Sequence, residues 1–105
     1  MSLYATIDDE PAGDVATGSG WSDFVRVVEL FDGVDELRQI TEYGWADEGS
    51  LLVADLKSLI QEGSLTTDQI SIANGLLAIA EQMEVGEVLT ISDGVGVVEN
   101  AEVPA

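Results

Sequence analysis

Apolar and polar residues alternate at the start of the chain, and the alternation then gives way to a mainly polar segment. Residues 3–7 alternate and are rich in strand-forming types, so we predict a short first strand there. A proline, Pro11, and the charges before it stop this strand. From Asp8 to Gly20 the composition shifts to Gly, Asp, Ala, Ser and Thr, which bury little surface. We therefore predict a long flexible loop over residues 8–20.

The middle of the chain repeats apolar residues at the helical period. Residues 21–31 and 34–43 each form such a stripe and predict two short helices. A third stripe, rich in Leu, Val and Ile, predicts a helix before Gly63. Its N-cap would be Asp47 or Ser50, and Gly63 would be the left-handed residue after its end.

A fourth helix is predicted from a start signal and the apolar residues that follow it. Thr66 and Gln69 have the spacing of a capping box, and the helical period then continues to Met83. The dipeptide Asn74-Gly75 inside this segment would equally suit a two-residue hairpin. We favour the helix because strong helix formers follow, although an interior glycine costs about 1 kcal/mol. The glycine suggests close packing at that position.

The end of the chain carries its clearest turn signal. Residues 88–92, the dipeptide Asp93-Gly94 and residues 95–98 are typical of a strand, a tight turn and a second strand. Residues 99–105 are predicted to be a frayed tail. We expect an α+β fold in which the first strand pairs with this hairpin and about four helices pack on one face of a small antiparallel sheet. The alternative is a helical bundle with an appended hairpin.

Composition adds charge to this picture. The chain has 105 residues, of which 46% are hydrophobic, enough for one core, so we expect a single domain over residues 1–105. Its 21 Asp and Glu face only three Lys and Arg and no His, which gives a net charge of −18 at pH 7. Three dispersed cations cannot form the basic surface that nucleic acid requires, and an anionic membrane would repel the chain as well.

Two missing residue types narrow the chemistry. Without Cys or His the chain has no disulfide, thiolate metal site, Cys nucleophile or Ser-His-Asp triad. It also has no run of about 18 apolar residues and no secretory leader, so we expect a cytoplasmic protein. These features favour a binding role over an enzymatic one.

Clustered carboxylates are candidate ligands for a hard cation. Asp8, Asp9, Glu10 and Asp14 fall in one predicted loop, and Ca²⁺ or Mg²⁺ prefers several oxygen ligands. The residue spacing of an EF-hand is absent. Loose association of counter-ions is therefore the favoured alternative to a specific site, and we expect no tightly bound cofactor.

A second group of candidates combines aromatic and acidic residues. Tyr43 and Trp45 flank a glycine and are followed closely by Asp47 and Glu48. Exposed Tyr and Trp dominate interface anchors, whereas in a small domain they more often belong to the core. We take these four residues as the candidate binding site. Trp21, on the apolar face of a predicted helix, is assigned to the core instead.

Three explanations of the acidity remain. An acidic surface can steer association with a basic partner, as in nuclease inhibitors and immunity proteins. It can also keep a protein soluble in a salt-rich medium, where screening removes the self-repulsion. The third explanation is divalent-metal binding by carboxylates. We favour a non-enzymatic protein-interaction module, an inhibitor or immunity-type protein for a basic partner. Exposed sheet edges would also allow association with a second copy.

Overall fold

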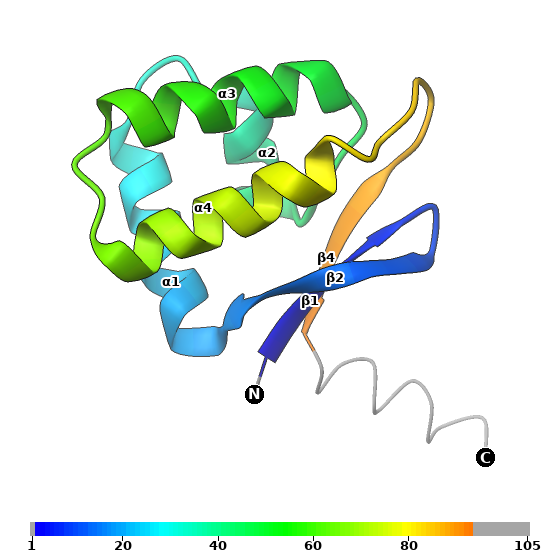
Figure 1. Cartoon of the computed structure of the whole chain (residues 1–105), viewed down its shortest axis with the longest axis horizontal. Helices are drawn as coiled ribbons and strands as arrows, with labels where there is room; N and C mark the ends of the chain where they lie inside the picture. The colour runs from blue at the N-terminus through cyan, green and yellow to red at the C-terminus, as the bar shows by residue number, and fades with distance from the viewer. Residues whose placement is uncertain (1, 94–105) are drawn as a thin grey trace.

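The computed structural model describes residues 2–93 and places four helices together on one side of a four-stranded antiparallel sheet (Figure 1). The strand order is β2-β1-β4-β3. The elements are β1 (Ser2–Ile7), β2 (Glu10–Thr17), α1 (Gly18–Leu30), α2 (Asp35–Tyr43), β3 (Trp45–Ala46), α3 (Gly49–Glu62), α4 (Thr67–Ala80) and β4 (Leu89–Asp93). The predicted α+β class is confirmed, as is the pairing of the first strand with the strand near the C-terminus.

The predicted loop over residues 8–20 is wrong. Asp8 and Asp9 form a tight turn with φ angles of 50° and 69°, and β2 then runs back antiparallel to β1. Two successive positive φ angles are typical of a type I′ hairpin turn, and Asp is one of the residues that tolerate them. Pro11 is accommodated because β2 is an edge strand with a register irregularity beside it. The polar composition that suggested a loop is that of a largely exposed edge strand.

Helix α1 begins three residues earlier than predicted because Thr17 caps it. The Thr17 hydroxyl accepts a hydrogen bond from the Gly20 N–H at 3.1 Å. Phe24 and Val28 are fully buried on the inner side of the helix. Trp21 is half-buried and packs against this core, with its ring centroid 5.6 Å from that of Phe24.

The predicted caps of α3 are wrong at both ends. The N-cap is Glu48, not Asp47 or Ser50, and its side chain makes no capping hydrogen bond. Gly63 is extended, with φ of −79° and ψ of 150°, rather than left-handed. Glycine is nevertheless the residue that fits there, because a Cβ would lie 2.6 Å from the Leu59 carbonyl oxygen.

Helix α4 confirms the predicted capping box. The Thr66 hydroxyl accepts from the Gln69 N–H at 3.2 Å, and the Gln69 Oε1 accepts from the Thr66 N–H at 2.9 Å. The helix runs through Asn74 and Gly75, so the hairpin alternative is excluded. The expected close packing at Gly75 is wrong, because an added Cβ would meet no atom within 4 Å.

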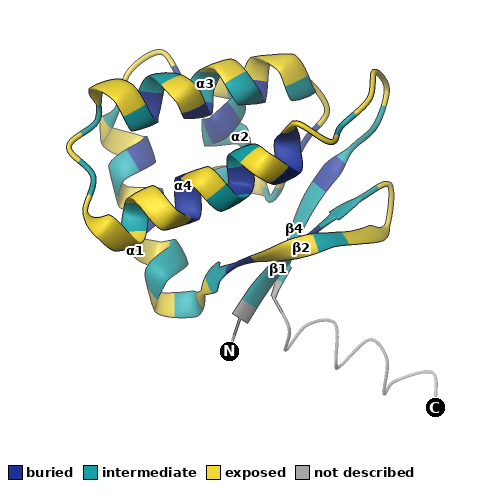
Figure 2. Ribbon diagram, viewed as in Figure 1, coloured by how far each residue is buried: buried dark blue, intermediate teal, exposed yellow. Residues whose placement is uncertain are grey.

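The core lies between the helices and the inner face of the sheet, and buried positions line the helix sides that face one another (Figure 2). Ala46 pairs with Leu89, and both are fully buried, so they belong to this inner face. Trp45 pairs with Thr90, which in turn pairs with Thr6. Since neighbouring residues of a strand point to opposite faces, Trp45 lies on the outer face of the sheet, away from the helices.

The largest fully buried side chains come from all four helices, from the residue directly before α2 and from β4. They are Phe24, Val28, Val34, Leu37, Ile40, Leu52, Leu56, Leu59, Leu76 and Leu89. Within residues 2–93, none of the helices is both long enough and apolar enough to cross a membrane. The predicted second strand of the C-terminal hairpin, at 95–98, and the predicted tail, at 99–105, lie outside the described residues.

Candidate functional site

The carboxylates predicted as metal ligands lie at the start of the sheet. Asp8 and Asp9 form the β1–β2 turn, Glu10 begins β2, and Asp14 lies further along that strand. The Asp8 carboxylate accepts a hydrogen bond from the Val88 N–H at 2.9 Å, and the Asp8 N–H donates to the Val88 carbonyl at the same distance. Among the side chains that the structure describes, residues 3–92, no group of three or more Asp and Glu is arranged to hold a metal ion. The structure therefore gives Asp8 a role in joining two segments of the chain.

The predicted aromatic pair lies on a well-fixed backbone. Tyr43 ends α2 and is 71% exposed, and Trp45 begins β3 and is 43% exposed. Between them, Gly44 adopts a left-handed conformation with φ of 83°. Its N–H donates to the Ile40 carbonyl at 2.9 Å, and its carbonyl accepts from the Ile91 N–H at 2.8 Å. Both aromatic side chains are thus presented to solvent from a hydrogen-bonded junction between a helix and the sheet.

The two predicted acidic residues follow this pair and are exposed. Asp47 and Glu48 precede the first turn of α3. The Glu48 N–H donates to the Glu36 carboxylate at 3.1 Å, which fixes the backbone while leaving both side chains at the surface. Within residues 2–93, no ion pair involves Asp47 or Glu48. The residues from Tyr43 to Glu48 are called the aromatic–acidic segment below.

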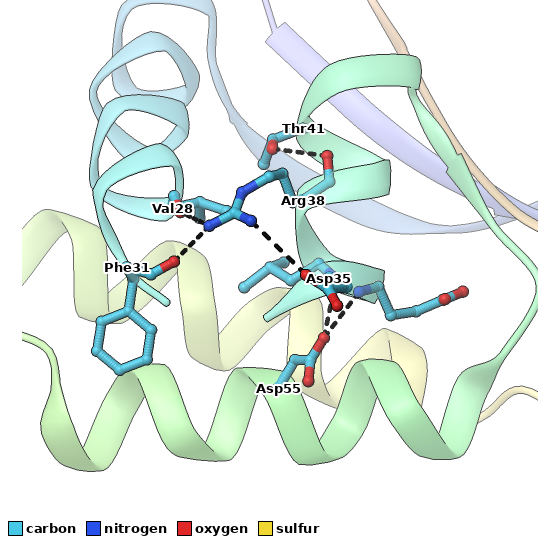
Figure 3. A network of polar contacts seen from close by, with 8 residues as sticks. Val28, Phe31, Asp35, Arg38, Thr41 and Asp55 are labelled. Atoms are coloured by element: carbon cyan, nitrogen blue, oxygen red, sulfur yellow. Dashed lines mark hydrogen bonds and ion pairs between the residues drawn. The ribbon is translucent and has the colours of Figure 1, made fainter. Parts of the chain in front are cut away.

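The few cations lie elsewhere and do not neutralise this segment. The Arg38 guanidinium donates to the Phe31 carbonyl at the end of α1 and lies 3.6 Å from the Asp35 carboxylate (Figure 3). A cation at this position complements the negative end of a helix. Arg26 on α1 and Lys57 on α3 are exposed.

One carboxylate near Arg38 also serves the fold. Asp55, on α3, accepts hydrogen bonds from the N–H groups of Glu36 at 2.9 Å and Leu37 at 3.1 Å (Figure 3). The N-cap of α2 is Val34, whose side chain cannot accept a hydrogen bond. Asp55 therefore caps α2 from a neighbouring helix.

Sequence reasoning missed a hollow beside the aromatic–acidic segment. Its volume is about 390 Å³, and it lies between the first turn of α3 and the loop from α4 to β4. Its lining residues are Asp47, Glu48, Gly49, Ser50, Met83, Glu84, Val85, Gly86 and Val88. The sequence at this place has Val85 between Glu84 and Gly86, a pattern that indicates a turn but not a hollow.

A hydrogen-bonded turn forms one wall of this hollow. The Glu87 N–H donates to the Glu84 carbonyl at 3.0 Å, and the Glu87 carboxylate accepts from the Glu84 N–H at 2.6 Å. Gly86 supplies the positive φ, 91°, that a turn of this kind needs. Val85, at the tip, is fully exposed. Residues 84–87 are called the Val85 turn below.

Comparisons with protein families, with curated proteins and with solved structures found no match to this chain. A function must therefore be argued from the chemistry of its surface.

Proposed function

We propose that the protein is a non-enzymatic interaction module that binds a basic protein through the aromatic–acidic segment, as an inhibitor or immunity-type protein would. The observation that carries this proposal is the exposure of Tyr43 and Trp45 on a fixed backbone, directly before two carboxylates that make no ion pair in the described part of the chain. A basic partner could bury the two aromatic side chains and, in the same segment, approach two negative charges that complement its own.

The energetics of interfaces support this assignment. Tyr and Trp are enriched among the few residues that carry most of the free energy of binding, because they bury a large area at low conformational cost. Carboxylates around such anchors accelerate association with a basic partner and disfavour acidic competitors. The fixed junction at Gly44 reduces the entropy lost on binding, since the anchors are already positioned.

The chemistry of the side chains supports a non-enzymatic role. The chain has no His or Cys, the side chains most used for proton transfer and nucleophilic attack. Among residues 3–92, whose side chains the structure describes, no polar or charged residue is buried. Carboxylates that act as an acid or a base usually owe their reactivity to a partly dehydrated environment.

Capture experiments on immobilised protein test this proposal. The Tyr43→Ala/Trp45→Ala double variant should lose a basic partner that the wild type retains at low salt and releases at high salt, because the anchors are gone and charge alone is screened. The control is Leu30→Ala, which removes an apolar side chain that is 87% exposed on α1. Equal capture by the wild type and the double variant would contradict the proposal, as would capture of no basic protein by the wild type.

A specific observation favours salt adaptation as a second explanation of the charge. Exposed carboxylates occur on all four helices and on β2, rather than on one face alone. A melting curve against KCl concentration separates the two explanations. An interaction module should remain folded at about 0.1 M salt, whereas a salt-adapted protein should fold only at roughly molar concentrations, where its self-repulsion is screened.

A further inference from the structure

The hollow beside the aromatic–acidic segment is lined by both apolar and acidic residues. We propose that it receives the side chain of an arginine from the basic partner. This inference rests on the proposed function and names one chemical feature of that partner. It assigns a role to Glu84 and the Val85 turn, which the aromatic–acidic segment does not include.

Apolar residues supply part of the surface on which an arginine stem would lie. They include Met83, Val85 and Val88, and Gly49 lies close to Met83. A Cβ on Gly49 would lie 3.0 Å from the Met83 Cβ, so glycine lets the two walls approach closely. Long cationic side chains bury their methylene groups on such surfaces and keep the charged group at the rim.

Acidic residues from two segments line the hollow. Asp47 and Glu48 line it beside the first turn of α3 and Glu84 lines it in the Val85 turn, and among the described residues no Lys or Arg lines it. The N–H groups of the first turn of α3 contribute an opposing positive charge of only about half a unit. Three carboxylates outweigh it, so a cation is favoured over an anion.

The arrangement favours arginine over lysine. A guanidinium carries five donors in a plane and can bond more than one carboxylate at once, whereas an ammonium is a compact point charge. The Val85 turn is held by two internal hydrogen bonds, so it should lose little conformational entropy on binding. Asp47 and Glu48 belong both to the hollow and to the aromatic–acidic segment, so one partner can contact both.

An NMR titration of the full chain with Nα-acetyl-arginine amide tests the proposal. The largest amide shifts should occur at residues 47–50 and 84–88. The lysine analogue should bind about threefold more weakly, because it has fewer donors, and the neutral norleucine analogue should cause no shifts there. Shifts of equal size around Asp32 and Glu62, exposed acidic residues outside the hollow, would overturn the proposal, and so would equal binding of arginine and lysine.

A matched pair of variants distinguishes a specific effect of the hollow on binding from the effect of the protein's net charge. Glu84→Gln and Glu62→Gln each remove one exposed negative charge, but only Glu84 lines the hollow. Glu84→Gln should weaken binding of the arginine amide about threefold, and Glu62→Gln should leave it nearly unchanged. Equal effects of the two variants would contradict the assignment.

The two proposals can fail separately. If partner capture depends on Tyr43 and Trp45 but the arginine amide causes no localised shifts, the hollow is not an arginine site and the interaction module stands. If the amide binds in the hollow while the Tyr43→Ala/Trp45→Ala variant still captures the partner, the proposed function of the aromatic–acidic segment fails instead.

Discussion

Two regions of this molecule use carboxylates in opposite ways. At the start of α2, Asp55 accepts hydrogen bonds from two backbone N–H groups and is thereby engaged within the fold. Beside the hollow, Asp47 and Glu84 make no side-chain hydrogen bond or ion pair within residues 3–92, whose side chains are described. A chain with 21 acidic residues thus contains carboxylates with backbone partners and carboxylates without them. Carboxylates bonded to the backbone stabilise the structure, and those without partners are free to meet another molecule.

The largest expected effect comes from removing the two aromatic anchors. Tyr43→Ala/Trp45→Ala should weaken binding of the captured partner about 100-fold, in line with the loss of two interface anchors. The fold should change little, because both side chains are substantially exposed. Surface plasmon resonance measures the affinity and circular dichroism the fold. A variant that unfolds would show instead that the aromatic pair belongs to the core.

Removal of the cap on α2 should have the next largest effect. Asp55→Ala leaves two part-buried N–H groups without their acceptor, so the free energy of unfolding should fall by about 2 kcal/mol in a urea titration. Asp55→Asn keeps an acceptor oxygen and should recover part of the loss. An unchanged urea midpoint in Asp55→Ala would contradict the claim that the carboxylate at the start of α2 stabilises the fold.

Loss of the Arg38 guanidinium should cost less, about 1 kcal/mol. Arg38→Met keeps most of the aliphatic stem and removes the donor to the Phe31 carbonyl at the end of α1. Asp35→Asn is the control, because the Asp35 side chain is 97% exposed. Thermal melts of both variants measure the effect. If Asp35→Asn lowers the melting temperature as much as Arg38→Met does, the ion pair rather than the carbonyl contacts dominates.

The smallest expected effect is that of calcium. The Asp8 carboxylate is already bonded to the Val88 N–H, and Asp14 lies on β2 rather than in the turn. We therefore expect CaCl₂ to raise the melting temperature no more than NaCl of matched ionic strength, because both act by screening. A larger rise with CaCl₂ would support specific binding and restore the metal interpretation.

Local signals explain which parts of the fold could be predicted. The capping box at Thr66 and Gln69 and the end of α2 at Gly44 depend on residues within one helical turn, and both were correct. Strand β2 was missed because an edge strand is defined by its partner β1, while its own polar composition and Pro11 are typical of a loop. The N-terminal cap of α2 could not be predicted either, because the capping residue, Asp55, belongs to a different helix.

Part of the candidate site could likewise be predicted from local sequence, and part of it could not. The aromatic–acidic segment is contiguous, so its four predicted residues could be chosen from the sequence. The exposure of Tyr43 and Trp45 could not be predicted, since helix and strand patterns leave their orientation open. The hollow unites residues 47–50 with residues 83–88, which lie more than 30 positions apart. The packing of α4 along α3 and the pairing of Ala46 with Leu89 bring these segments together.

The central claim is that the unpartnered carboxylates serve binding, whereas the hydrogen-bonded ones serve folding. It is tested most directly by measuring partner affinity and the free energy of unfolding together, in Asp47→Asn/Glu48→Gln and in Asp55→Ala. The account predicts that the first variant loses about tenfold in affinity and keeps its stability, and that the second loses stability and, while folded, keeps its affinity. Equal losses of stability in both variants, or unchanged affinity in the first, would contradict it.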